Sequence, residues 1–171
     1  LSPKAAGRTI AVHTTAKGPQ VAVVTILGRL FMSMPGDNPF VCIDRVLSRL
    51  NPDIKIVLVE VHAEATSEKI ALGWHLDGRV SVVFGTHTHV PTADEEVLPG
   101  GTGYITDLGM TGPYRSVIGM RAGPVLKRFT TMRPTNWSTA KGDVRVCGAV
   151  FEIDEVTGKC RSVERVRVDI T

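Results

Sequence analysis

Aromatic residues and cysteines are scarce in this sequence of 171 residues, with aromatics at 5% and only three cysteines. Cys42, Cys147 and Cys160 are far apart, and no CxxC pair occurs. This excludes a disulfide framework and a cysteine-based zinc knuckle, and it predicts a protein of the reducing cytoplasm. No apolar run approaches the roughly 20 residues that a membrane-spanning helix needs, so we expect no association with a membrane.

The sequence also lacks the short motifs of several enzyme classes. It contains no HExxH, no GxxxxGK[ST], no GxSxG and no GxGxxG after a strand. These absences exclude a zinc protease helix, a phosphate-binding loop of the nucleotide triphosphatase type, a serine nucleophile elbow and a dinucleotide-binding turn.

What remains is an ordinary globular composition, with 43% hydrophobic and 22% charged residues. We therefore expect residues 1–171 to form a single domain with a buried core. Twenty Lys and Arg stand against seventeen Asp and Glu, and the charges are spread along the chain with a mildly basic cluster at 159–167. Nucleic-acid footprints concentrate basic residues more strongly, so no stable nucleic-acid binding is expected.

Hairpins are predicted near both ends of the chain. Residues 8–14 and 20–27 are rich in β-branched residues and flank a turn, and residues 143–153 and 161–169 form a second pair of predicted strands. Between them, Asn38 can cap a helix that has Pro39 at its first position and apolar residues at helical spacing to about residue 50.

The middle of the chain alternates strands and helices. Apolar runs at 54–61 and 79–84 predict buried strands, and 102–107 predicts another. A helix is expected at 67–77, with Thr66 as its cap and Gly78 at its end, and a further helix near 121–131. This mixture predicts an α/β fold with a mixed or paired-sheet core.

Three histidines directly follow two of the predicted buried strands. His62 comes after the strand at 54–61, and His87 and His89 follow the strand at 79–84 with one residue between them. Loops at the carboxyl ends of strands are where open α/β sheets place their ligand sites. A single histidine there is usually a packing residue, but three at two neighbouring strand ends favour a metal site.

Two further residues are candidates for supporting these imidazoles. A threonine hydroxyl between the histidines, such as that of Thr88, could orient an imidazole, and Glu60 on the strand could support His62.

The histidines belong to a longer pattern that includes HAEATSEK, GTHTHVPTAD and ITDLGMTGP within residues 61–114. This block resembles a family of calcineurin-like binuclear metallophosphoesterases whose bacterial members are known as 2′,3′-cyclic-nucleotide phosphodiesterases. The preceding LGRLFM and DNPF also fit, so the resemblance covers essentially the whole chain.

The resemblance implies a four-layer α/β/β/α sandwich with two metal ions, iron or manganese, with zinc as an alternative. His62 and His87 would then bind one ion and His89 the other. It also implies that a metal-bridged hydroxide hydrolyses a cyclic nucleotide or another phosphodiester.

The family's remaining ligand segments, with Asp, Glu-Asn and Gly-Asn-His, do not occur in these residues. We therefore expect a C-terminal portion of a longer domain, with the N-terminal strands missing and the catalytic residues upstream, and with doubtful activity of its own. The alternatives are a non-catalytic metal-binding fragment or interaction module, and a capsule-synthesis type of metallophosphoesterase. An apolar loop at 30–40 leaves room for a homo-oligomer, although burial in the core explains it more simply.

Overall fold

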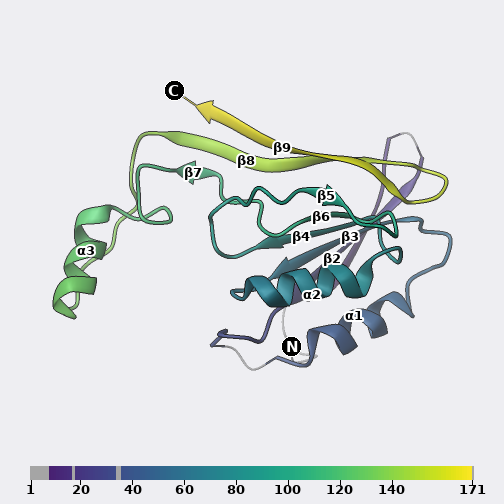
Figure 1. Ribbon diagram of the computed structural model, residues 1–171, viewed down its shortest axis with the longest axis horizontal. Helices are drawn as coiled ribbons and strands as arrows, with labels where there is room; N and C mark the ends of the chain where they lie inside the picture. The colour runs from purple at the N-terminus through teal and green to yellow at the C-terminus, as the bar shows by residue number, and fades with distance from the viewer. Residues whose placement is uncertain (1–7, 17, 34–35, 171) are drawn as a thin grey trace.

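The computed structural model describes residues 8–16, 18–33 and 36–170. Its larger sheet has six strands in the order β1-β2-β3-β4-β6-β5 (Figure 1). Strands β2, β3, β4 and β6 are parallel, and β1 and β5 run antiparallel at the two edges. The bounds are β1 (Ile10–Thr14), β2 (Gln20–Leu27), β3 (Ile56–His62), β4 (Val82–Thr86), β5 (Glu96–Val97) and β6 (Gly103–Ile105).

Two helices, α1 (Pro39–Leu47) and α2 (Thr66–Leu76), cover one face of this sheet (Figure 1). Helix α1 begins as predicted, because the Asn38 side chain accepts a hydrogen bond from the Phe40 backbone N–H at 3.0 Å. Helix α2 begins one residue earlier than predicted. Its N-cap is Ala65, which makes no side-chain hydrogen bond, so the prediction of Thr66 as the cap is wrong.

The core lies between these helices and the sheet. Fully buried side chains from β2, β3 and β4 meet those of both helices there; they include Val24, Ile43, Val59, Leu72 and Val83. Strand β3 is buried along most of its length, which explains its nearly continuous apolar sequence.

A second, three-stranded sheet lies on the opposite face of the larger one (Figure 1). It consists of β7 (Gly112–Pro113), β8 (Val144–Ile153) and β9 (Cys160–Ile170). The two sheets approach closely at Gly103 of β6, where an added Cβ would lie 2.6 Å from the Cys160 sulfur. The third helix, α3 (Ala122–Thr131), stands apart from both sheets (Figure 1).

The α/β class and both terminal hairpins are therefore confirmed. The described residues form three layers, with helices α1 and α2, the larger sheet and the smaller sheet in that order. Within these same residues, no helix has the length and apolar character needed to cross a membrane. The apolar loop at 30–40 includes residues 34 and 35, which lie outside the described part.

Candidate metal centre

Two of the predicted site residues meet at the carboxyl ends of β3 and β4. His62 is the last residue of β3 and lies beside Thr86, the last residue of β4, in the parallel ladder. His87 follows directly on the chain. Because parallel strands end at the same edge of a sheet, side chains that are 25 positions apart in the sequence become neighbours.

The imidazoles of His62 and His87 face each other through nitrogen atoms. The distance from His62 Nε2 to His87 Nδ1 is 3.2 Å. The ring centroids are 4.8 Å apart, and the ring planes are nearly perpendicular. Both side chains are partly buried, so the pair remains accessible from solvent.

A chain of hydrogen bonds from β2 to β4 sets the protonation of His62. The carboxylate of Glu60 accepts from the Thr86 hydroxyl at 2.8 Å and from the Thr25 hydroxyl at 2.8 Å. Because the Thr86 hydroxyl donates its one hydrogen to Glu60, its oxygen must accept the second hydrogen bond, which comes from His62 Nδ1 at 2.9 Å. His62 therefore carries its proton on Nδ1, and Nε2 keeps a lone pair.

In His87, the outer nitrogen that contacts a supporting residue is Nε2, whereas in His62 it is Nδ1. His87 Nε2 lies 3.1 Å from the carboxylate of Glu64, which only accepts hydrogen bonds. That contact places the proton of a neutral His87 on Nε2 and leaves the lone pair on Nδ1. With a neutral His87, two lone pairs face each other across 3.2 Å and a metal ion can satisfy both; with a protonated His87, its Nδ1–H donates to His62 Nε2 instead.

A metal ion fits this gap. Two nitrogen atoms at about 2.0–2.1 Å from a tetrahedral ion are separated by about 3.3 Å. The observed separation of 3.2 Å is close to that value. Ligand histidines usually donate their second N–H to a carboxylate, a carbonyl or another oxygen, as both rings do here. The donor set of two imidazoles suits zinc, iron or manganese.

His89 does not join this pair. Its side chain is exposed, and its Nδ1 donates to the backbone carbonyl of Ile118 at 3.1 Å, which leaves Nε2 as the free acceptor. In the part of the chain that the structure describes, no three His, Cys, Asp or Glu side chains are gathered around one point. In the described residues His89 therefore makes a hydrogen bond to neither His62 nor His87, and its contact is with the Ile118 carbonyl.

The backbone of this loop is unusual at both histidines. His87 has a φ of 101° and His89 a φ of 66°, positive values that are uncommon for residues other than glycine, although histidine, asparagine and aspartate adopt them more often than the rest. The preceding Gly85 allows β6 to approach, since an added Cβ would lie 1.7 Å from the Thr106 carbonyl oxygen. Close strand packing and two left-handed residues together turn the imidazoles out of the sheet.

A buried ion pair lies directly beneath the histidine loop. Lys69 of α2 and Asp107, which follows β6, are each 1% exposed and 2.9 Å apart. Lys69 also donates to the Thr86 carbonyl at 3.3 Å. The same Asp107 oxygen accepts from the Thr88 backbone N–H at 3.2 Å and from the Thr88 hydroxyl at 2.8 Å. The pair therefore ties α2, β6 and the loop between the two histidines together.

Helix α2 holds a second loop through Glu68, the residue before this lysine. The buried Glu68 carboxylate accepts from the backbone N–H of Arg29 at 2.9 Å and of Leu30 at 3.3 Å. Gly28 makes this possible, because an added Cβ would lie 2.5 Å from Glu68 and 2.4 Å from the Ala63 side chain. The segment after β2 is thereby fixed beside the end of β3.

Next to the site, two groups around β6 have shifted pKa values. Desolvation acts to raise the pKa of Asp94, but hydrogen bonds from Thr106 and Thr92 outweigh it and hold that pKa below its ordinary value. Burial raises the pKa of the Tyr104 hydroxyl to about 12. Both residues bond to the Thr106 side chain, which links them into one network at the end of β6.

The structure thus brings together only part of the predicted set. His62 and His87 converge, His89 lies apart, and Glu60 supports His62 through a threonine. That threonine is Thr86, whereas Thr88 makes no hydrogen bond to an imidazole in the described residues and instead donates to Asp107. The sequence reasoning missed Glu64, Lys69 and Asp107. Helix periodicity offered one signal, because it places Lys69 on the same face as the buried Leu72 and Leu76.

Comparison with known proteins identifies the family to which this chain belongs. The family model described as YmdB-like protein matches residues 1–166. A curated relative from Bacillus subtilis (strain 168), the 2′,3′-cyclic-nucleotide 2′-phosphodiesterase, is 44% identical over 157 residues, which cover 92% of this chain and 59% of the relative. The chain therefore spans less than two thirds of the length of that relative.

Two solved structures share the fold. A hypothetical protein from Thermus thermophilus superposes with a TM-score of 0.91 at 42% identity, covering 98% of this chain and 64% of the other. A structure described as a novel phosphatase from Mycoplasma pneumoniae gives a TM-score of 0.87 at 33% identity, covering 95% and 58%. The resemblance found in the histidine-bearing segments is confirmed by these matches, and the chain belongs to the YmdB-like family.

Proposed function

We propose that this chain forms the histidine-bearing portion of a metal-dependent phosphodiesterase that acts on 2′,3′-cyclic nucleotides in the cytoplasm. The observation that carries the proposal is the pair of acceptor nitrogens on His62 and His87, 3.2 Å apart, each fixed by an oxygen on its opposite side. The name of the Bacillus subtilis relative supports the reaction class.

In this proposal His62 and His87 share one ion, and His89 binds a second one through its Nε2. The ions are iron or manganese, with zinc as the alternative, and they would sit within the four-layer sandwich of the longer family domain. When bound, they supply Lewis-acid stabilisation of phosphoryl oxygens and a nucleophile at neutral pH.

The residues of this chain contribute position and proton placement. Thr86 and Glu60 keep the His62 proton on Nδ1, and Glu64 keeps the His87 proton on Nε2, so both inner nitrogens stay available. None of these groups is assigned as the acid or base of the reaction. The bound substrate would approach from the open side of the histidine pair, beyond the carboxyl ends of β3 and β4.

The direct test is the metal content of the purified protein after dialysis, followed by titration with Zn²⁺ and Mn²⁺. We expect His87→Gln to reduce metal affinity at least tenfold, and His75→Gln, on α2 away from the pair, to leave it unchanged. No metal uptake by the parent protein would refute the metal centre. Hydrolysis of a 2′,3′-cyclic nucleotide by the loaded protein then tests the reaction.

A second candidate is a metal-binding module without catalytic activity. Its support is the geometry itself, because two imidazoles converge while the third points elsewhere. One tightly bound ion per chain with no hydrolysis would favour this candidate. Two ions per chain with hydrolysis would favour the phosphodiesterase.

A further inference from the structure

The charge of the molecule is unevenly divided. Residues 108–142 contain six Lys and Arg and no Asp or Glu, whereas the rest of the chain holds fourteen basic and all seventeen acidic residues. The net charge of +3 therefore combines +6 on this segment, which we call the arm, with −3 on the remainder. The six cations are Arg115, Arg121, Lys127, Arg128, Arg133 and Lys141.

The arm contacts His89, the predicted site residue that lies apart from the His62–His87 pair. It begins after Asp107, and its backbone carbonyl at Ile118 accepts the hydrogen bond from His89. In Figure 1 the arrowheads of β3 and β4 point toward the side of the molecule on which α3 stands. Four of the six cations lie outside α3, so positive charge is present along the arm and not only on the helix.

These cations are not neutralised within the molecule. In the ranges that the structure describes, none of the six takes part in an ion pair, and five of them are exposed. The β8–β9 hairpin behaves differently, because Arg145, Arg161, Arg165 and Arg167 each pair with an acidic residue. The arm thus carries positive charge that is available to an external anion.

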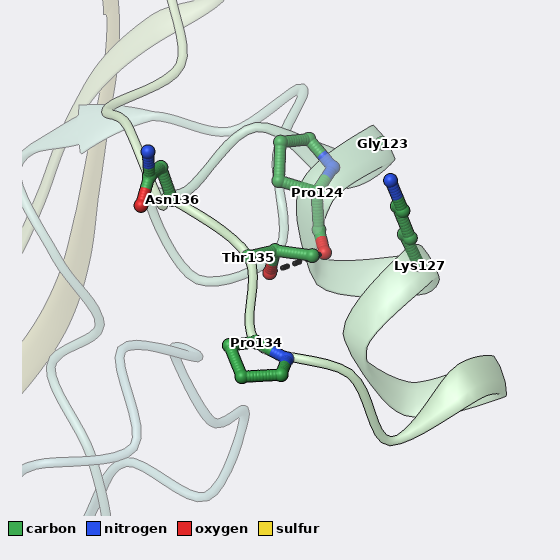
Figure 2. A pocket seen from close by; sticks show the side chains of 6 residues that line it. All are labelled: Gly123, Pro124, Lys127, Pro134, Thr135 and Asn136. Carbon is green, nitrogen blue, oxygen red and sulfur yellow. Dashed lines mark hydrogen bonds between the residues drawn. The ribbon is translucent and has the colours of Figure 1, made fainter.

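Exposed rings accompany the charges. Phe129 is 67% exposed and Trp137 is 55% exposed. Between α3 and the segment that returns from it lies an open hollow of about 420 Å³, lined by Lys127, Thr135, Asn136 and neighbouring residues (Figure 2). A positively charged surface with exposed aromatic side chains is the chemistry that binds single-stranded nucleic acids, through phosphate contacts and base stacking.

We propose that the arm binds the sugar-phosphate backbone of a single-stranded polynucleotide and holds its end near the histidine pair. The substrate class would then be an oligonucleotide with a terminal cyclic phosphodiester, in addition to the free nucleotide; this part rests on the proposed function. No stable nucleic-acid binding is expected from the sequence because its basic residues are not densely clustered, but that criterion does not take into account that residues 108–142 lack acidic residues.

An anionic membrane is the competing partner, because Leu126 and Phe129 of α3 and Met132, its C-cap, are exposed apolar residues. Nucleic acid is favoured for two reasons. The arm contacts His89, which the proposed function assigns to the phosphodiesterase site, and most of its cations lie outside the amphipathic helix. A membrane-surface helix gathers its charges on the helix itself.

The test measures binding of a labelled 12-nucleotide single-stranded RNA by fluorescence anisotropy, without added metal and at several salt concentrations. The arm variant is Lys127→Gln/Arg128→Gln/Arg133→Gln, and the matched control is Arg45→Gln/Arg49→Gln/Lys55→Gln, which removes three exposed cations elsewhere. For single strands the slope of log K against log salt is about −0.7 per phosphate contact, so six contacts give about −4 and three give about −2.

We expect the arm variant to bind at least tenfold more weakly and with the smaller slope, and the control to stay within twofold of the parent protein. Phe129→Ala/Trp137→Ala, which keeps the charges, should weaken binding at least fivefold. Equal losses in arm and control variants would overturn the proposal. So would binding to phosphatidylserine vesicles with no binding to RNA.

The two proposals fail separately. RNA binding that depends on the arm, in a protein that takes up no metal, would refute the metal centre and leave the arm's role intact. Hydrolysis of a cyclic mononucleotide, together with equal RNA binding by the parent protein and the arm variant, would refute the arm alone.

Discussion

Replacing Lys69 with methionine should destabilise the protein strongly, because it leaves the Asp107 carboxylate buried without its countercharge. Removing one partner of a buried ion pair costs about 3–5 kcal/mol. Asp107 would still accept from the Thr88 N–H and hydroxyl and from the Gly109 N–H. These donors place the expected loss for Lys69→Met near the lower end, at about 3 kcal/mol.

Removing the other partner of the ion pair should lower the free energy of unfolding further. Asp107→Asn removes the countercharge of the Lys69 ammonium, which is 1% exposed and keeps only uncharged acceptors, namely the new amide oxygen and the Thr86 carbonyl at 3.3 Å, among the described residues. We expect a loss of about 4–5 kcal/mol. The double variant should be more stable than the sum of the two losses predicts, by at least about 2 kcal/mol, since it removes both charges together.

Urea unfolding followed by circular dichroism measures these differences. With a slope of about 2 kcal/mol per molar urea, a loss of about 3 kcal/mol lowers the midpoint by about 1.5 M. Lys55→Met is the matched control, because Lys55 is exposed and should change stability by less than about 0.5 kcal/mol. A loss below about 1 kcal/mol for Lys69→Met, or strict additivity in the double variant, would refute this account of the ion pair.

Three further predictions concern the same end of the sheet. Thr86→Val should lower Zn²⁺ affinity about 10–100-fold in titration calorimetry, because His62 loses the hydroxyl that fixes its proton; unchanged affinity would contradict this. Gly85→Ala should lower the thermal midpoint sharply, since its Cβ would meet a backbone carbonyl oxygen at 1.7 Å, whereas Gly148→Ala, which meets nothing within 4 Å, should be nearly neutral. The lowered pKa of Asp94 contributes stability above its unfolded value of 3.8 that is lost as pH falls through the folded pKa, so Asp94→Asn should flatten the acid limb of stability against pH; a parallel curve would count against it.

Much of the fold could be predicted because its signals are local. The Asn38 cap, the β-branched hairpin at the N-terminus and the apolar runs of β3 and β4 each depend on neighbouring residues, and each was found within a few positions of its true bounds. The start of α2 at Thr66, with Ala65 as its N-cap, could not be predicted in this way. Its first turn is held by backbone bonds and by Glu68 contacts to a distant loop, not by a cap side chain.

The convergence of His62 and His87 and the support from Glu60 could be predicted, whereas the contacts of Glu64, Lys69 and Asp107 could not. The positions of His62 and His87 at the ends of two predicted strands indicated that they are neighbours. The parallel register, which pairs His62 with Thr86, brings the two histidines into contact. Lys69, by contrast, looks like an ordinary helix lysine until Asp107, 38 positions later, is folded against it. Glu64 likewise reaches His87 only through the path of the loop after β3. Such pairings are tertiary, so residue type and local spacing do not reveal them.

The left-handed backbone at His87 and His89 also has a consequence for how this protein can change. Holding a non-glycine residue in such a conformation costs on the order of 1–3 kcal/mol, which the packing around it must supply. Glycine at either position would release that strain. Selection or engineering for stability alone would therefore tend to erase the imidazoles, and under the proposed function their presence in a strained loop is stability given up for metal binding.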